Sequence, residues 1–469
     1  MDSRTLKTSV LFAFAASAAL LSSSALAAPA KADSALHDQA LELLKRGIAF
    51  RTVIPGDQVK PYAEYLKGVL VQAGFKPDEV KIEPVAGSSI LVARYAGADR
   101  SKKPIVIIDH MDVVEAKAAD WTRDPFTPVV ENGYVYGRGS LDDKFDVSIV
   151  VTVLSKLKRE GWKPGREVVL ALSGDEETMQ QTARKFAGDL KNAELVLNGD
   201  AGGGQLGEDG KPEFYALQAA EKTYADFQVT VTDPGGHSSR PSPTNPIYRL
   251  ARDLDRLAAY EFPAMQSEIT MAAFKATAAA KPGPLGDALR RYVANPKDEA
   301  AIATLSADRD MVGQLRTTCV ATMINGGHAT NALPQKVTAN VNCRIFPGTP
   351  SEEVRATLVK VLDDPTATVE RQSDGAIDAG PSPLRPDVLA AVTKAVHARY
   401  PGLPVLPAMS AGATDSMFFR ALGVPAYGVA GVFMKSSDDF AHGLNERVPV
   451  ATIDGALAQW ESILRDLAK

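Results

Sequence analysis

The stretch that decides the fold is residues 104–112, PIVIIDHMD, where a short β-branched apolar run leads into His110 and Asp112. Two more runs of this kind follow it, at residues 167–173 and 193–197. Helical sequence lies between the runs, and strands that alternate with helices predict an α/β layered sheet. Each run ends in polar residues, which is where a sheet of this class presents its functional groups.

A second pattern begins at residue 223. Stretches that alternate apolar and polar residues, as half-buried strands do, are interleaved with helical sequence in the order β-α-β-β-α-β, which predicts a ferredoxin-like unit. The strands are expected at 224–232, 317–324, 337–345 and 367–371, and the helices at 241–257 and 351–362. The segment 261–314 is an extra piece of helical and loop character.

The α/β pattern resumes near residue 386, with helices expected at 388–400 and 447–467. We therefore expect an α/β domain with a central mixed sheet, in two parts at residues 34–220 and 380–469. A ferredoxin-like α+β domain at residues 221–379 would be inserted between them, with hinges near Ala220 and Gly380.

The N-terminus has the order of a secretory signal peptide. Arg4 and Lys7 precede an apolar run at residues 10–21, and Ala25-Leu26-Ala27 forms a small-x-small cleavage pattern. The alternative is a membrane anchor, but the run is short for a bilayer. We expect a signal peptide at residues 1–27 and a periplasmic or secreted mature protein without a stable membrane anchor.

Composition excludes some partners. The chain has 469 residues, of which 45% are hydrophobic and 23% charged, as in a soluble globular protein of two domains. Its formal net charge is −5 without a basic stripe, so nucleic acid is not an expected partner. The two cysteines, Cys319 and Cys343, lie in strand-like stretches, and the sequence leaves open whether they form a disulfide or are two buried thiols.

Acidic and imidazole side chains gather at the predicted strand ends. His110 and Asp112 follow the first run, Glu176 and Glu177 the second, and Asp200 the third. Taken singly, each has a structural alternative, because a strand-end histidine is often a hydrogen-bonding residue and a run of acids is often a solvated loop. One imidazole with two or three carboxylates is nevertheless a donor set that zinc accepts.

Two further candidate ligands, Asp142 and His442, complete this set. Residues 137–144, GRGSLDDK, allow a tight turn before a helix, so that Asp142 stands at a helix N-terminus, where it could also be a mere cap. His442 lies far downstream, where the first domain resumes. The joint occurrence of these residues predicts a dinuclear hydrolase whose metal ions lie about 3.5–4 Å apart and share a carboxylate.

This ordered set resembles a known family. The order H-x-D, G-R-G-x-x-D-x-K, D-E-E, Asp and a late His is similar to the di-zinc metallopeptidase family of carboxypeptidase S, carnosine-type dipeptidases, aminoacylases and succinyl-diaminopimelate desuccinylase. The resemblance implies that His110 and Asp200 bind one metal and that Glu177 and His442 bind the other. Asp142 would bridge the two ions.

The resemblance also implies the roles of two other acids. Glu176 would be the general base and acid, because a buried carboxyl beside metals can have the required pKa. Asp112 would orient His110. The expected cofactors are two Zn²⁺ ions, with Co²⁺ or Mn²⁺ as alternative metals.

The inserted domain would be a lid and a dimerisation surface. The resemblance implies a substrate-binding role for His237, either in its own active site or in that of a partner subunit. It implies the same role for Asn331, Arg344, Gly412 and Thr414. Ala413 departs from the family's G-G-T-D loop, which puts the geometry of that loop in doubt. A homodimer is expected, unless residues 261–314 fill its surface.

The expected substrate is a small peptide. In this family, Asp at position 200 and the sequence of residues 141–144 lean towards dipeptidases and carboxypeptidases. An N-acyl amino acid deacylase with the same metal site is the alternative. A non-catalytic peptide-binding protein is less favoured, because every expected ligand and Glu176 are present.

Overall fold

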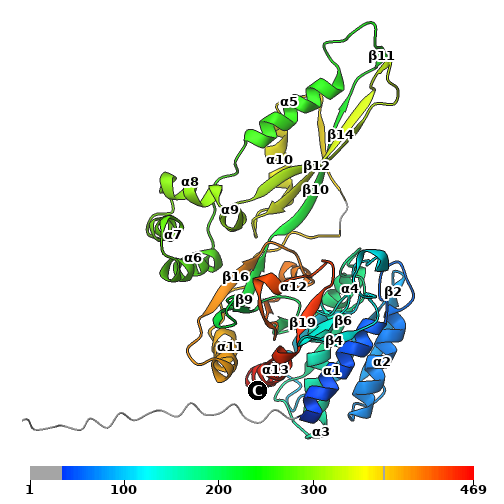
Figure 1. Ribbon diagram of the computed structural model, residues 1–469, viewed down its shortest axis with the longest axis vertical. Coiled ribbons are helices and arrows are strands. Elements are labelled where there is room, and N and C mark those ends of the chain that lie inside the picture. The colour runs from blue at the N-terminus through cyan, green and yellow to red at the C-terminus, as the bar shows by residue number, and fades with distance from the viewer. Residues whose placement is uncertain (1–33, 373–374) are drawn as a thin grey trace, which may run out of the picture. The chain divides into compact units, whose positions relative to one another are not determined.

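The computed structural model describes residues 34–372 and 375–469 (Figure 1). The predicted signal peptide, residues 1–27, lies outside the described residues. Within them, no helix combines the length and the apolar character that a membrane span requires.

The core of the fold is a ten-stranded sheet with the order β1-β2-β6-β3-β7-β17-β9-β8-β18, in which β16 also pairs with β9. Its parallel pairs include β3 with β6 and with β7, whereas β1, β2, β8 and β9 also form antiparallel pairs. The predicted α/β class with a central mixed sheet is therefore confirmed. The strands are β1 Val80–Val85, β2 Ser88–Tyr95, β3 Ile105–His110, β6 Val168–Ser173, β7 Leu195–Asn198, β8 Gly203–Leu206, β9 Pro212–Glu221, β16 Val405–Ser410, β17 Ala426–Gly428 and β18 Phe433–Lys435.

Helices cover both faces of this sheet, because its central strands are apolar on both sides. In β3, Ile105 and Ile107 belong to one core cluster and Val106 and Ile108 to another. The first face packs against α1 Ser34–Ala49, α2 Val59–Gln72, α3 Lys144–Arg159, α11 Pro386–Arg399 and α13 Ile453–Leu467. The second face packs against α4 Gln181–Asp189 and α12 Ser416–Ala421.

Three parallel strands, β6, β3 and β7, bring the predicted site residues to one edge. In their register, His110 lies opposite Ser173 of β6, and Ile108 lies opposite Asn198 of β7. The loops after Ser173 and Asn198 therefore begin beside His110. A separate small sheet has the order β19-β5-β4, with β4 Val129–Glu131, β5 Tyr134–Tyr136 and β19 Arg447–Pro449. It pairs the stretch of chain before Asp142 with the stretch after His442.

A separate four-stranded antiparallel sheet has the order β12-β14-β10-β15. We call this sheet and its two helices the four-stranded unit. Its chain order, β10-α5-β12-β14-α10-β15, is the predicted β-α-β-β-α-β order, and Figure 1 shows α5 and α10 beside the sheet. Its elements are β10 Thr223–Thr232, α5 Pro246–Ala259, β12 Thr318–Gly326, β14 Lys336–Ile345, α10 Ser351–Leu362 and β15 Thr368–Arg371. Two short strands, β11 Gly236–His237 and β13 Ala332–Leu333, form a separate antiparallel pair.

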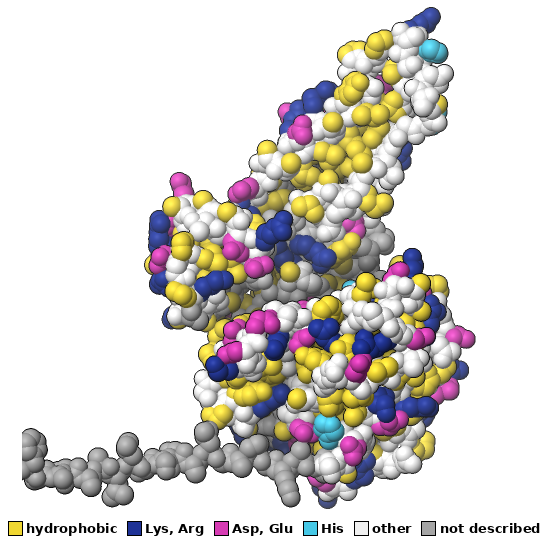
Figure 2. All heavy atoms as spheres, viewed as in Figure 1, with side chains coloured by type: hydrophobic (Ala, Val, Ile, Leu, Met, Phe, Trp, Pro, Cys, Tyr) yellow, Lys and Arg dark blue, Asp and Glu magenta, His cyan; other side chains and the backbone are white. Residues whose placement is uncertain are grey.

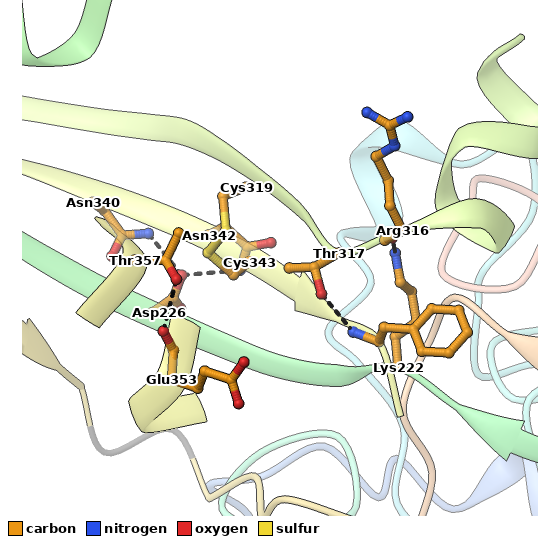
Figure 3. Close-up of a disulfide and its surroundings, with 11 residues drawn as sticks. Lys222, Asp226, Arg316, Thr317, Cys319, Asn340, Asn342, Cys343, Glu353 and Thr357 are labelled. Atoms are coloured by element: carbon orange, nitrogen blue, oxygen red, sulfur yellow. Dashed lines mark hydrogen bonds between the residues drawn. A yellow bond between two sulfur atoms is a disulfide. The ribbon is translucent and has the colours of Figure 1, made fainter. Parts of the chain in front are cut away.

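Cys319 of β12 and Cys343 of β14 form a disulfide, which decides the question that the sequence left open (Figure 3). The two residues are direct partners in the antiparallel register, and their Cα atoms are 4.1 Å apart. On the other side of the sheet, Asp226 accepts hydrogen bonds from Asn340 and Asn342. The disulfide therefore ties the edge strand β12 to the interior of the four-stranded unit.

The extra segment is a cluster of four helices: α6 Glu268–Ala280, α7 Pro284–Ala294, α8 Glu299–Ala307 and α9 Arg309–Leu315. They share their own apolar core, which includes Phe274, Leu289 and Tyr292. The cluster leaves the outer edge of β12 uncovered, because Val320, Met323 and Ile324 are 58%, 61% and 60% exposed. Figure 2 shows hydrophobic side chains at the surface in this part of the molecule.

Two predicted helix starts were wrong. The helix expected from residue 241 begins at Pro246, because Asn245 caps it by accepting a hydrogen bond from the backbone N–H of Ile247. The helix expected from residue 447 begins at Ile453, because Arg447–Pro449 pairs with β5 as a strand. The helical periodicity of the sequence extends further in both places, but the cap residue sets the start of the first helix and strand pairing sets the start of the second.

Candidate metal centre

Five side chains from five parts of the chain form overlapping groups that could hold metal ions. One group is His110, Asp142 and Asp200, and another is Asp142, Glu177 and His442. In each group the ligand atoms lie within 4.8 Å of one another. These are the five residues that the sequence singled out as metal ligands, and the structure brings all of them together.

Asp142 lies between the two imidazole rings. Its Oδ1 is 2.8 Å from His110 Nε2, and its Oδ2 is 3.2 Å from His442 Nε2. Asp200 Oδ1 is 3.7 Å from His110 Nε2, and Glu177 Oε1 is 2.8 Å from His442 Nε2. The arrangement thus has one imidazole and one outer carboxylate on each side of a shared carboxylate.

Asp112 contacts both His110 and the loop of the two glutamates, through its backbone carbonyl and its carboxylate respectively. Its backbone carbonyl lies 3.0 Å from His110 Nδ1, whereas its carboxylate Oδ1 is 3.7 Å from that nitrogen. The carboxylate instead accepts hydrogen bonds from the backbone N–H groups of Glu176 and Glu177, at 3.0 and 3.1 Å. Asp112 therefore fixes both the ring of His110 and the loop that carries the two glutamates.

A buried ion pair between Arg138 and Glu446 holds the other two ligands. Glu446 Oε1 accepts the N–H groups of Leu141 and Asp142, and its Oε2 accepts that of Gly139. Arg138 donates to Glu446 Oε2 at 2.5 Å and to the backbone carbonyl of His442 at 3.2 Å. The pair joins the loop of Asp142 to the loop of His442, which are more than 300 residues apart in sequence.

The electrostatics of the site favour cations. Burial by itself lowers the pKa of His110, but the nearby carboxylates of Asp112, Asp142 and Asp200 raise it well above its ordinary value. Asp142 and Glu177 raise the pKa of His442 to about 10. The Nε2 atom of each imidazole therefore faces carboxylate oxygens, and a cation could lie between them. The nitrogen and oxygen donors present fit a dinuclear zinc site.

Glu176 lies beside the metal groups, and among the described residues no Lys or Arg forms an ion pair with it. It forms a group with His110 and Glu177 and is 8% exposed. Burial raises its pKa well above the ordinary value, and the nearby Asp415 and Asp200 add to this effect, while His110 opposes it. A carboxyl with a raised pKa can both take and return a proton near neutral pH.

Three of the predicted substrate residues lie close to one another. Arg344 Nη1 donates to the backbone carbonyl of Ala411 at 3.3 Å, and its guanidinium lies over the ring of Tyr224. The backbone N–H of Gly412 donates to Ser410 Oγ, and the buried Thr414 donates to Glu221 through both its N–H and its hydroxyl.

His237 and Asn331 lie next to each other in the four-stranded unit. His237 pairs with Ala332, and the N–H of Ser238 donates to the carbonyl of Asn331 at 3.0 Å. Both residues are exposed. Within the described chain, no hydrogen bond or ion pair joins either of them to the side chains of the metal groups.

Sequence reasoning missed the residues that support the site. Arg138 stands inside the quoted stretch 137–144 and Glu446 follows His442 by four residues, but neither they nor Glu221 were given a role from the sequence. Glu221 forms a buried ion pair with Arg420, at 2.8 Å, and so holds the Thr414 loop. The available signal was charge: Arg138 beside glycines, and Glu446 four residues after His442, are charged groups in stretches that lead into the core.

Comparisons with known proteins agree with this geometry. The family model described as "Peptidase family M20/M25/M40" matches residues 106–466 of this chain. The N-fatty-acyl-amino acid synthase/hydrolase PM20D1 of Xenopus tropicalis is 29% identical over 89% of this chain and 83% of its own length. The M20 family metallo-carboxypeptidase Sso-CP2 of Sulfolobus solfataricus shares the fold, with a TM-score of 0.69 at 20% identity over 92% of this chain and 99% of its own.

The di-peptidase Dug1p of Saccharomyces cerevisiae also shares the fold, with a TM-score of 0.64 at 19% identity over 93% of this chain and 97% of its own. These findings confirm the resemblance that the motifs suggested, and with it a hydrolase that acts on amide bonds. Since the family match covers well over half of the 469 residues, this chain belongs to peptidase family M20/M25/M40.

Proposed function

We propose that this protein is an exported dinuclear metallopeptidase that hydrolyses an amide bond in small peptides, as a dipeptidase or carboxypeptidase. The observation that carries the proposal is the position of Asp142, whose two carboxylate oxygens face His110 and His442 at 2.8 and 3.2 Å. A shared carboxylate between two imidazoles, with a further carboxylate on each side, suits two adjacent cations.

The metals would be two Zn²⁺ ions, although Co²⁺ or Mn²⁺ could use the same donors. His110 and Asp200 would hold one ion, Glu177 and His442 the other, and Asp142 both. Bound there, such ions lower the pKa of water and polarise an amide carbonyl.

Glu176 would move the proton. Its carboxylate takes a proton from the attacking water and then delivers it to the leaving amine nitrogen, so that one residue acts first as base and then as acid. The raised pKa of Glu176 suits the second step, and the hydrogen bonds of Asp112 to the N–H groups of Glu176 and Glu177 hold the loop in place.

Arg344 would bind the free carboxylate of the substrate, since a guanidinium forms paired hydrogen bonds with that group. The backbone N–H groups near Gly412 and the hydroxyl of Thr414 lie on the same loop as Ala411, which Arg344 contacts. The hydroxyl of Thr414 donates to Glu221 and accepts from Asn198. Because Glu221 ends β9 and Asn198 ends β7, the central sheet holds this loop in position.

Residues 221–379 would act as a lid and as a dimerisation surface. His237 and Asn331 make no contact with the metal groups of their own chain in the part of the chain that the structure describes, which is expected if they serve the site of a partner subunit. The exposed apolar residues Val320, Met323 and Ile324 on edge strand β12 would pair with a second copy.

A deacylase for N-acyl amino acids is the second candidate. The similarity to an N-fatty-acyl-amino acid synthase/hydrolase, at 29% identity, favours it. The metal groups and Glu176 would serve both reactions, because both cut an amide bond. A binding protein without activity would lack a reason for a buried Glu176 beside the metal groups.

The proposed location rests mainly on the N-terminal pattern. The basic residues, the apolar run and the Ala25-Leu26-Ala27 motif support export to the periplasm or beyond, with removal of residues 1–27. The disulfide of Cys319 and Cys343 suits an oxidising compartment.

The test is a substrate panel with metal-stripped and Zn²⁺-reconstituted protein. The panel holds free dipeptides, C-terminally blocked dipeptides and N-acetyl amino acids. We expect Zn²⁺ to restore cleavage of free dipeptides and blocking of the C-terminal carboxylate to suppress it. Cleavage of acyl amino acids alone would move the assignment to the deacylase, and absence of metal-dependent turnover would refute both enzymes.

A further inference from the structure

Strand β12 is attached unevenly to the rest of the four-stranded unit. Just before the strand, the hydroxyl of Thr317 accepts the backbone N–H of Phe346 (Figure 3). The carbonyl of Arg316 accepts a hydrogen bond from the buried ammonium group of Lys222. Beyond Cys319, by contrast, every residue of β12 is exposed. The strand is therefore fixed at the end that follows the helical cluster and lies open along the rest of its length.

Cys319 is the residue through which β12 joins the core of this unit. Of the nine β12 residues, Cys319 alone packs against the apolar cluster that contains Phe227 and Val341. Its bond to the buried Cys343 makes this attachment covalent. The disulfide therefore supplies in one contact the side-chain anchorage that other strands obtain from several packed residues.

Beyond the disulfide, β12 has little support besides its backbone pairing. Its register against β14 shifts between Ala321 and Met323. One side-chain hydrogen bond joins the two strands in this part of the described chain, from the amide of Asn340 to the hydroxyl of Thr322. An irregular ladder with few buried contacts is typical of a segment that opens locally at a low free-energy cost.

We propose that the disulfide of Cys319 and Cys343 is a redox-controlled clasp that orders β12 and so makes pairing with a second copy of this chain depend on oxidation. With the bond closed, the edge of β12 is a fixed template for the strand of the partner. With the bond open, β12 has to be ordered at the moment of pairing, and the entropy lost in that step weakens the dimer. The clasp rests on the dimer of the proposed function and is independent of the metal chemistry.

The redox step is a thiol–disulfide exchange. Closing the bond removes two electrons and two protons from the cysteine thiols and reduces a donor disulfide to two thiols. In the reverse direction, a thiolate of an external dithiol attacks the sulfur of the half-buried Cys319, and Cys343 leaves and takes up a proton. The second thiol of the dithiol then releases Cys319, so that the dithiol becomes a disulfide.

The clasp links assembly to the compartment. A reducing cytosol keeps the two thiols apart, and an oxidising compartment such as the periplasm closes the bond. The chain would thus pair with a second copy after its export and not before it.

The experiment compares Zn²⁺-reconstituted wild-type protein in three states. These are the oxidised protein, the protein reduced with dithiothreitol and freed of it under nitrogen, and the reduced protein treated with oxidised glutathione. Hydrogen exchange by mass spectrometry follows the amides of β12 and, as an internal reference, those of β10. We expect reduction to speed exchange in β12 at least about ten-fold, to leave β10 unchanged, and to be reversed by oxidised glutathione.

A partner strand would itself protect β12, so exchange is also measured without a dimer. The variant Met323→Lys, Ile324→Glu, which is expected to be a monomer, should show the same ten-fold effect of reduction in order of magnitude. For wild-type protein, sedimentation velocity over a dilution series should show a dimer dissociation constant at least about ten-fold higher after reduction.

Two variants serve as controls. Cys319→Ser, Cys343→Ala cannot close the bond, so it should match reduced wild-type protein in both measurements and ignore both reagents. Asp364→Asn weakens the same unit where Asp364 pairs with Arg249, but it keeps the disulfide. It should therefore leave both the exchange of β12 and the dimer as in wild-type protein.

The outcomes separate the clasp from the proposed function. If reduction left the exchange of β12 unchanged, or sped that of β10 equally, the bond would add general stability alone and the clasp would be overturned. A dissociation constant that ignored reduction, or a wild-type monomer in all three states, would overturn the control of assembly. Neither result bears on the metal centre. Absence of Zn²⁺-dependent hydrolysis in the oxidised samples would refute the proposed function and leave the clasp standing.

Discussion

Glu176 is the residue on which the proposed chemistry depends most directly. Glu176→Gln keeps the size of the side chain but removes the proton acceptor, so we expect kcat to fall by about 10²–10⁴-fold. Metal content should stay the same, because Glu177 rather than Glu176 faces His442. Steady-state kinetics together with metal analysis of the purified variant would check this, and unchanged kcat would show that another group moves the proton.

The ion pair of Arg138 and Glu446 makes a different prediction, about stability and metal binding. Both side chains are buried, at 4% and 0% exposure. Glu446→Ala would leave the guanidinium and three backbone N–H groups without their acceptor, and we expect a loss of about 3–5 kcal/mol in the free energy of unfolding. The variant should also bind less metal, because Asp142 and His442 lose their common support.

Denaturant unfolding and metal analysis would measure these effects. The matched control is Glu64→Ala, which removes an exposed helix ion pair with Lys60 and should cost less than about 0.5 kcal/mol. If Glu446→Ala unfolded like this control and bound metal normally, the pair would have no role in holding the site.

The residues of the metal groups could be predicted from the sequence, but the residues that hold them in position could not. His110, Glu177 and Asp200 could be predicted because each follows an apolar strand, and parallel strands end at one edge of a sheet. The partner of Arg138 could not be predicted, since Glu446 is 308 residues away and nothing local links the two. Long-range contacts between single charged groups leave no periodic signal.

Among the strands, those made of buried apolar runs could be predicted, whereas those that form only through pairing could not. β3, β6 and β7 are short runs of buried apolar residues, so their positions were predicted to within about two residues. β8, Gly203–Leu206, is rich in glycine and gave no strand pattern, and it exists because β9 and β18 pair with it. Strand formation there is set by tertiary pairing rather than by local sequence.

The disulfide allows a prediction about the four-stranded unit. Cys319 and Cys343 close a loop with a sequence separation of 24, so removing the bond should cost about 3 kcal/mol by loop entropy. We expect a reducing agent to lower the melting temperature of wild-type protein and to leave the double variant Cys319→Ser, Cys343→Ala unaffected. Calorimetry with and without reductant measures this, and a wild-type melting temperature that ignores reductant would contradict it.

The contact between α5 and the end of α10 should make stability depend on acid pH. Burial alone would raise the pKa of Asp364, but hydrogen bonds from Arg249 and Thr366 hold it at about 2. Because this pKa is lower than the value of about 3.8 in an unfolded chain, the interaction stabilises the fold above pH 4. That contribution is lost as the pH falls from about 4 to 2, and it amounts to about 2 kcal/mol at neutral pH.

Asp364→Asn checks the assignment. Denaturant unfolding at pH 7, 5, 4 and 3 should show the variant about 2 kcal/mol less stable at pH 7, with a difference that narrows towards pH 3. A difference that stayed constant over this range would show that the carboxylate of Asp364 is not the titrating group.

The whole molecule poses the question of whether one chain is a complete enzyme. Its metal groups come from both sequence segments that flank the four-stranded unit, because His110 precedes that unit and His442 follows it. His237 and Asn331 stay exposed within it, although the resemblance gives them a role at the site. Assembly of two copies through the uncovered edge of β12 would reconcile these observations.

This assembly can be tested through the surface that would form it. Met323→Lys with Ile324→Glu places charges on the exposed edge, and we expect the dimer to dissociate into monomers with loss of kcat. Val359→Lys, at an exposed position of α10, is the control and should leave the dimer intact. Sedimentation velocity and kinetics on the same samples would measure both properties, and a wild-type monomer with full activity would refute the proposed dimer.

Complementation gives the sharpest form of the test, because it asks which subunit supplies His237. Glu176→Gln lacks the proposed base and His237→Ala lacks the proposed lid residue, so each homodimer should be inactive. In a mixed dimer, the His237→Ala subunit keeps Glu176 and would receive His237 from its Glu176→Gln partner. Random exchange of equal amounts makes about half of the dimers mixed, each with one working site, so activity should recover to about a quarter of the wild-type value. Mixtures that stayed inactive after proven subunit exchange would show that His237 serves its own chain or does not serve the site at all.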